Sequence, residues 1–131
     1  MTDRALLQHI LCADDDADMR MILDVALGTI GGWRVTMAGD GEETLASARD
    51  DRPDLILLDA SMAGLDGPGT LSALRADPAL ASIPVVFVTG HAAPDEVANF
   101  IAMGALGVIA KPFDPMGLAT RLRALWGARP L

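Results

Sequence analysis

Short runs of apolar residues alternate with segments of helical periodicity along the whole chain. The apolar runs predict five β-strands, at His9–Ala13, Trp33–Ala38, Asp54–Leu58, Pro84–Val88 and Gly107–Ala110. The periodic segments predict five helices, at Ala17–Ile30, Gly41–Asp50, Gly67–Asp77, Pro94–Met103 and Asp114–Trp126. Apolar residues in the first helical segment recur every three or four positions, which is typical of a helix with one buried face.

The residues between these segments agree with the predicted boundaries. Gly31 follows the first helical segment, and Asp40 and Asp66 stand at the N-cap positions of the second and third. The third and fourth strands are nearly unbroken aliphatic runs, as expected where both faces of a parallel sheet are covered. Five strand–helix units with short connections predict an α/β fold, a doubly wound parallel sheet with helices on both faces.

Length and composition bound the organisation of the chain. The 131 residues fit one domain, and a hydrophobic content of 51% with a mean hydropathy of +0.34 supplies a core. We expect a single domain over residues 1–131 with its core at about 9–126. Only the residues GARPL follow Trp126, so no output domain is expected.

The charge balance and the single cysteine indicate which partners and which cellular compartment to expect. A net charge of -8 and a pI near 4.4, with the arginines dispersed, argue against a nucleic-acid partner. The one cysteine, Cys12, excludes an intramolecular disulfide and suits a reducing cytosol. The N-terminus lacks the features of a signal peptide, and no apolar run approaches the ~18 residues of a membrane span. We therefore expect a cytoplasmic protein with no membrane partner.

Polar residues stand at the ends of four of the five predicted strands. Asp14 and Asp15 follow the first strand, Asp59 ends the third, Thr89 the fourth and Lys111 the fifth. Ligands of open α/β sheets bind beyond the carboxyl ends of the strands. A strand that simply leads into a polar loop would explain any one of these residues, but it explains four coincident strand ends poorly. The sequence therefore predicts a site at this edge.

The residue types of this group indicate a hard cation and a phosphate. Adjacent carboxylates repel one another, and carboxylate or carbonyl oxygens with retained waters suit Mg²⁺. Cys12 should point away by strand alternation, so zinc is not expected. Lys111 is the only lysine of the chain, and its compact charge suits a phosphate in a narrow cleft, where Thr89 offers a hydroxyl donor.

Four motifs resemble the receiver domain of two-component response regulators in order and spacing. They are ILCADDDADMR, PDLILLDASMAGLDG, PVVFVTG and GALGVIAKPFD. The resemblance spans about His9 to Trp126 and implies a flavodoxin-like sheet of strand order 2-1-3-4-5. It also implies two kinds of partner, namely a sensor histidine kinase or histidine phosphotransfer protein as donor, and a separate downstream effector.

The resemblance also assigns a role to each polar residue at the strand ends. Asp59 is implied as the phosphoacceptor, with Thr89 and Lys111 contacting phosphoryl oxygens. Asp15 is implied as a direct Mg²⁺ ligand, with Asp14 acting largely through bound water. Asp59 itself and the backbone carbonyl of Ser61 would complete the protein ligands. Such a domain is not an enzyme beyond catalysing its own phosphorylation and dephosphorylation.

The sequence departs from the family pattern at several positions. Val108 stands where the family usually has an aromatic residue, and Leu106 and Gly107 replace acidic residues that are common there. This more apolar face could dock a partner, dimerise weakly or remain a plain surface. Ala63 stands where the family often has proline. Met62, in the loop after Asp59, is a candidate for lining the site.

Three functions from different classes fit these observations. The first is a stand-alone receiver that accepts a phosphoryl group on Asp59 and signals or relays through protein contact. The second is a small Mg²⁺-dependent phosphatase with Asp59 as nucleophile, although Ser61 stands where such enzymes usually have a second aspartate. The third is an interaction module independent of phosphorylation, which the intact acidic group, Thr89 and Lys111 argue against.

Overall fold

A computed structural model describes residues 6–130 of the chain. The strands are β1 (His9–Ala13), β2 (Arg34–Ala38), β3 (Leu55–Asp59), β4 (Val85–Thr89) and β5 (Gly107–Ala110). The helices are α1 (Ala17–Leu23), its π-helical continuation η1 (Asp24–Ile30), α2 (Gly41–Asp50), α3 (Gly67–Ala76), α4 (Pro94–Ala102) and α5 (Leu118–Ala128). The strands form one parallel sheet of order β2-β1-β3-β4-β5, which confirms the predicted fold.

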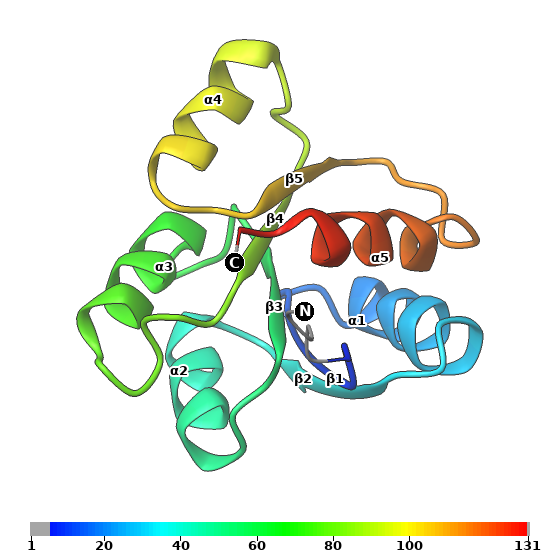
Figure 1. The fold of residues 1–131 in the computed structure, drawn as a ribbon, viewed down its shortest axis with the longest axis horizontal. Helices are drawn as coiled ribbons and strands as arrows, with labels where there is room; N and C mark the ends of the chain where they lie inside the picture. Colours follow the sequence, from blue (N-terminus) through cyan, green and yellow to red (C-terminus); the bar gives the residue numbers. More distant parts are fainter. Residues whose placement is uncertain (1–5, 131) are drawn as a thin grey trace.

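The sheet is the middle of three layers (Figure 1). Helices α1 and α5 cover one face, and α2, α3 and α4 cover the other. Strand β1 shows the alternation that produces this arrangement, since Leu11 packs toward the α2–α3–α4 layer and Ile10 and Cys12 pack toward the α1–α5 layer. Burial raises the pKa of the Cys12 thiol, so this side chain is a buried apolar residue and not a reactive thiolate.

The two predicted N-caps are confirmed. The Asp40 carboxylate accepts a hydrogen bond from the Glu43 amide at 2.7 Å, and the Asp66 carboxylate accepts one from the Gly69 amide at 2.8 Å. Asp66 therefore fixes the start of α3 directly after the loop that follows β3. This cap determines how much chain lies between Asp59 and the first turn of α3.

The first predicted helical segment, Ala17–Ile30, is confirmed in its bounds, and its second half is π-helical instead of α-helical. The Gly31 amide donates to the Ala26 carbonyl, five residues earlier, at 3.1 Å. Gly28 within this segment weakens the α-helical preference. Arg123 of α5 also donates to the Gly31 carbonyl at 2.8 Å, and this tertiary contact holds the end of η1.

The last predicted helix begins later than expected, at Leu118 instead of Asp114. The Asp114 carboxylate accepts a hydrogen bond from the Met116 amide at 3.0 Å, and the Asp114 carbonyl accepts one from the Gly117 amide at 3.0 Å. This local turn competes with the helix over its first four residues. The bounds of β2, β3 and β4 each differ from the prediction by one residue.

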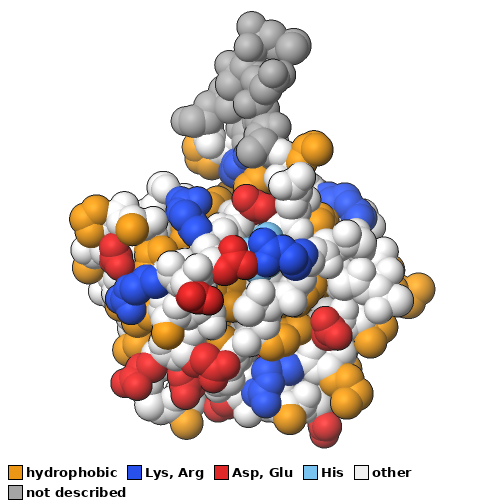
Figure 2. All heavy atoms as spheres, turned by 90° about the horizontal axis from the view of Figure 1, so that it is seen from below, with side chains coloured by type: hydrophobic (Ala, Val, Ile, Leu, Met, Phe, Trp, Pro, Cys, Tyr) orange, Lys and Arg blue, Asp and Glu red, His pale blue; other side chains and the backbone are white. Residues whose placement is uncertain are grey.

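Charged side chains of both signs are interspersed on the face shown in Figure 2, and the basic ones do not gather into a patch there. Within residues 6–130, the helices are too short or too polar to span a lipid bilayer.

Candidate functional site

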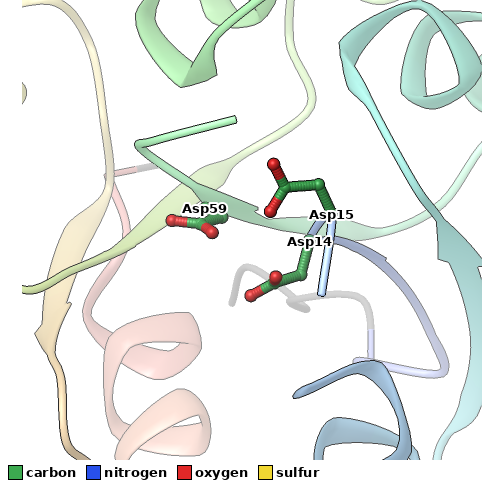
Figure 3. A group of neighbouring side chains, drawn as sticks. All are labelled: Asp14, Asp15 and Asp59. Atoms are coloured by element: carbon green, nitrogen blue, oxygen red, sulfur yellow. The ribbon is translucent and has the colours of Figure 1, made fainter. Parts of the chain in front are cut away.

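Three carboxylates meet at the carboxyl edge of the sheet (Figure 3). Asp14 and Asp15 follow β1 and Asp59 is the last residue of β3, and one oxygen from each lies within 4.8 Å of the others. Strands β1 and β3 are hydrogen-bonded neighbours, which places their carboxyl ends side by side. The structure thus brings together the acidic residues that the sequence analysis singled out.

The environment of these carboxylates is unfavourable for negative charge. Asp14 is 2% exposed and Asp59 is 5% exposed, whereas Asp15 is open to solvent. Burial raises the pKa of Asp14, and the Asp59 charge raises it further, while the Asp16 amide and Lys111 act in the opposite direction. A buried carboxylate next to like charge requires compensating positive charge or donors.

Lys111 supplies part of that compensation. It follows β5, and its Nζ lies 3.2 Å from Asp59 Oδ2 and 3.6 Å from Asp14 Oδ2. Its side chain is 27% exposed, so both interactions act where solvent screening is partly reduced. The only lysine of the sequence therefore reaches the carboxylate group from the far side of β4.

Backbone amides hold the Asp14 and Asp59 carboxylates in place, and an arginine holds the Asp14 backbone. The Asp16 amide donates to Asp14 Oδ1 at 2.9 Å, and Arg20 donates through Nη1 to the Asp14 carbonyl at 2.7 Å. On the other strand, the Ser61 amide donates to Asp59 Oδ1 at 3.1 Å. Sequence reasoning missed the two amide donors because a backbone amide carries no residue signature, and it missed Arg20, whose partner is a backbone carbonyl.

Thr89 ends β4 between the Asp59 and Lys111 strands and is 4% exposed. Its hydroxyl oxygen accepts a hydrogen bond from the His91 amide at 3.0 Å, which leaves the hydroxyl proton available for a ligand. His91 itself is exposed, with Nδ1 3.9 Å from a Glu96 carboxylate oxygen. It thus stands at the rim of the site and not among the carboxylates.

A cavity of about 350 Å³ opens over these residues. Its walls include the predicted polar residues Asp14, Asp15, Asp59, Ser61, Thr89 and Lys111. They also include Met19, which sequence reasoning missed although it is the first apolar residue after the acidic motif. The expectation for Met62 is wrong, because its side chain is 7% exposed and packs into the core under α2 and α3. A larger groove of about 450 Å³ lies beside Pro84, at the opposite edge of the sheet, and has no acidic lining.

The donor set fits a magnesium ion. Three carboxylates face a single lysine within the cavity, so the group carries an excess of negative charge that a divalent cation would neutralise. Carboxylate oxygens in an open, water-accessible cleft are the ligands that Mg²⁺ prefers. The described residues place no imidazole or thiolate among the three carboxylates, which does not favour zinc.

A doubly wound sheet of order 2-1-3-4-5 with an acidic group and a lysine at its carboxyl edge defines a flavodoxin-like signalling domain. The family model described as the response regulator receiver domain matches residues 10–123, and the chain belongs to this family of two-component signalling domains. The resemblance drawn from the sequence motifs is thereby confirmed.

Two similar curated proteins are regulators longer than this chain. The chain is 37% identical over 117 residues to the DNA-binding response regulator MtrA of Mycolicibacterium paratuberculosis, covering 89% of this chain and 50% of that protein. It is 35% identical over 118 residues to the probable transcriptional regulator ycf27 of Guillardia theta, covering 90% and 45%. The chain thus spans about half the length of the curated relatives it matches.

Among solved structures, the chemotaxis response regulator CheY4 of Vibrio cholerae superimposes with a TM-score of 0.84 at 29% identity. The superposition covers 92% of this chain and 99% of that one. The receiver domain of the Francisella response regulator 1452 gives a TM-score of 0.83 at 26% identity, covering 92% and 97%. These values confirm the CheY-like fold.

Proposed function

We propose that the protein is a receiver that accepts a phosphoryl group from a phosphohistidine onto Asp59 in a Mg²⁺-dependent reaction. The observation that carries this proposal is the position of Asp59, a buried carboxylate that lies beside Lys111 at 3.2 Å and faces the cavity. Asp14 also borders the cavity, and each of the two carboxylates accepts one backbone amide at Oδ1, but the Lys111 contact of Asp14 is longer, at 3.6 Å. Asp59 is therefore the better placed nucleophile.

In the transfer step, one carboxylate oxygen of Asp59 attacks the phosphorus atom of the donor. The new O–P bond forms as the P–N bond to the histidine ring breaks, and the ring nitrogen leaves with the electron pair of that bond. Lys111 and the Thr89 hydroxyl donate to phosphoryl oxygens as their charge redistributes. When bound, Mg²⁺ neutralises the carboxylates and supplies positive charge to the phosphoryl oxygens.

We propose Asp14, Asp15, Asp59 and the Ser61 carbonyl as the protein ligands of the ion. The geometry around Asp15 and Asp59 supports this assignment, because both carboxylates border the same cavity as Ser61. The test of the function is mass spectrometry after incubation with acetyl phosphate and Mg²⁺. One added phosphoryl group is expected, and its absence when EDTA replaces Mg²⁺ shows the metal dependence.

Titration with Mg²⁺ alone should shift the amide resonances of Asp14, Asp15 and Asp59, with saturation in the millimolar range that is typical of open carboxylate sites. The excess of carboxylates over ammonium groups is the physical reason. The variant Asp77→Asn, which alters a carboxylate that pairs with Arg49, should bind equally well. Unchanged resonances at high millimolar metal would contradict the assignment.

We further propose that the receiver acts as a single domain, as a monomer or weak dimer, and signals to a separate effector protein in the cytoplasm. The superposition covers 99% of the CheY4 chain, which supports this proposal because CheY4 is a response regulator of similar size. The DNA-binding activity in the name of MtrA belongs to a longer protein, of which the match covers 50%. We propose no nucleic-acid or membrane partner for the chain itself.

Helix α4 is the element best suited to carry the phosphorylation signal. None of its residues is fully buried, and it is held mainly through Phe100, whose ring lies 4.6 Å from that of Phe87. Val108 packs against the same core and offers no large ring that could swing between two positions. The signal should therefore pass through movement of α4 and the loop before it.

Beryllofluoride, which stands in for the phosphoryl group, should change hydrogen exchange most strongly in α4 and in residues 90–93, outside the site itself. A ligand shifts a conformational equilibrium only as far as its contacts differ between the two states, and Thr89 adjoins this loop. Helix α2, measured in the same experiment, serves as the internal control. Changes confined to Asp14, Asp15 and Asp59 would contradict this route.

A further inference from the structure

The loop between β3 and α3 contacts the carboxylate group through alternate backbone amides. The Ser61 amide donates to Asp59 Oδ1 at 3.1 Å, and the Ala63 amide donates to Asp15 Oδ2 at 3.1 Å. The second contact joins residues 48 positions apart in the sequence. The loop that follows the proposed phosphoacceptor therefore also holds a carboxylate from the β1 side.

The position of the Asp15 carboxylate depends on the Ala63 hydrogen bond more than the positions of the Asp14 and Asp59 carboxylates depend on their amide donors. Asp14 and Asp59 are buried, and each has Lys111 within 4 Å. Asp15 is exposed and repelled by both of them, so its side chain gains by turning toward water. Among residues 6–130, the Ala63 amide is the one hydrogen-bond donor to its carboxylate.

We propose that Ala63 is a positioning residue whose amide keeps the Asp15 carboxylate inside the metal-binding group before the ion arrives. This inference rests on the proposed function, because it concerns the affinity of the same site. Only Oδ2 is engaged, so Oδ1 stays available to the ion. The hydrogen bond comes from the backbone amide of Ala63 and not from its methyl group, so any residue except proline can donate it at this position.

This contact distinguishes the chain from family members that have proline at this position. Proline has no N–H to donate, so the corresponding carboxylate must be held by other means. In this chain the acidic group is assembled in advance, and binding need not order the Asp15 side chain. Preorganisation of this kind increases affinity without adding a contact to the ligand.

The test compares Mg²⁺ dissociation constants from NMR titration of the metal alone. Ala63→Pro should raise the constant roughly three- to tenfold, since it removes one hydrogen bond to an ionised and partly solvated group. Ala63→Ser retains the amide and should bind like the wild type. Ala79→Pro is the matched control, because the Ala79 amide donates to Asp77 Oδ1 at 2.9 Å, away from the site, and its loss should not change the constant.

An unchanged or tighter constant for Ala63→Pro would overturn the inference, as would an equal loss in Ala79→Pro. A wild-type chain that does not bind Mg²⁺ at all would instead overturn the proposed function, and the inference with it.

A second measurement needs neither metal nor a proline substitution. In metal-free protein, Asp15→Ala should speed hydrogen exchange at the Ala63 amide and shift its proton resonance upfield, and no change at that amide would overturn the inference.

Discussion

Replacement of Asp59 by asparagine should abolish the phosphoryl incorporation that the wild-type chain shows with acetyl phosphate and Mg²⁺. The amide keeps the shape of the side chain but lacks the anionic oxygen that attacks phosphorus, so the rate should fall by roughly two orders of magnitude or more. Asp14 and Asp15 remain in the variant, yet the Lys111 contact of Asp14 is longer, at 3.6 Å, and Asp15 has no lysine contact among the ion pairs of the described residues. Mass spectrometry of intact protein measures the outcome.

Asp54→Asn is the matched control for this substitution. Asp54 immediately precedes the same strand at the opposite edge of the sheet, where its carboxylate accepts hydrogen bonds from the Gln8 and His9 amides. An amide oxygen can accept there too, so this variant should fold and be labelled like the wild type. Equal labelling of Asp59→Asn and wild type would remove Asp59 from the role of phosphoacceptor. The label should also be lost at alkaline pH, as an acyl phosphate is.

The arrangement of elements was predictable because local and tertiary signals in this sequence agree. Each strand is short, apolar and bounded by polar or turn residues, and Asp40 and Asp66 bond to the first turns of their helices as their positions predict. The convergence of Asp59, Thr89 and Lys111 followed from topology alone. In a parallel sheet all carboxyl ends lie at one edge, whatever the conformation of the loops.

The features that were not predictable depend on contacts between distant residues or on loop geometry. The π-helical geometry of η1 accompanies the Arg123 contact to Gly31, which joins residues 92 positions apart. Met62 turns into the core and the Ala63 amide turns toward Asp15 in a loop whose backbone reverses through a left-handed conformation at Gly64, where φ is 74°. Hydrophobic periodicity contains no information about such a reversal, so the residue types alone could not separate Met62 from Met19 as a wall of the cavity.

The largest effect on stability is expected from Phe87→Ala. Phe87 is the largest fully buried side chain of the described residues, and it lies on β4 between Leu58 of β3 and Val108 of β5. Its ring also packs against Phe100 of α4 at 4.6 Å. Truncation removes apolar contacts on three sides, and neighbours held in the rigid sheet cannot collapse into the space. The free energy of unfolding should fall by about 3–5 kcal/mol.

Urea unfolding followed by circular dichroism measures this loss, and Val25→Ala, at a side chain that is 47% exposed, should cost about 0.5 kcal/mol or less. The effect should not be spread evenly over the molecule. Helix α4 has no fully buried residue of its own, so the loss of the Phe87 ring removes the main core contact of this helix, which Phe100 makes. Helices α2 and α3 keep their own buried residues. Hydrogen exchange in α4 should therefore rise more than in α2 or α3 under native conditions. A loss below about 1 kcal/mol with uniform exchange across the three helices would show that α4 is held by other contacts, and that the proposed signalling route lacks its structural basis.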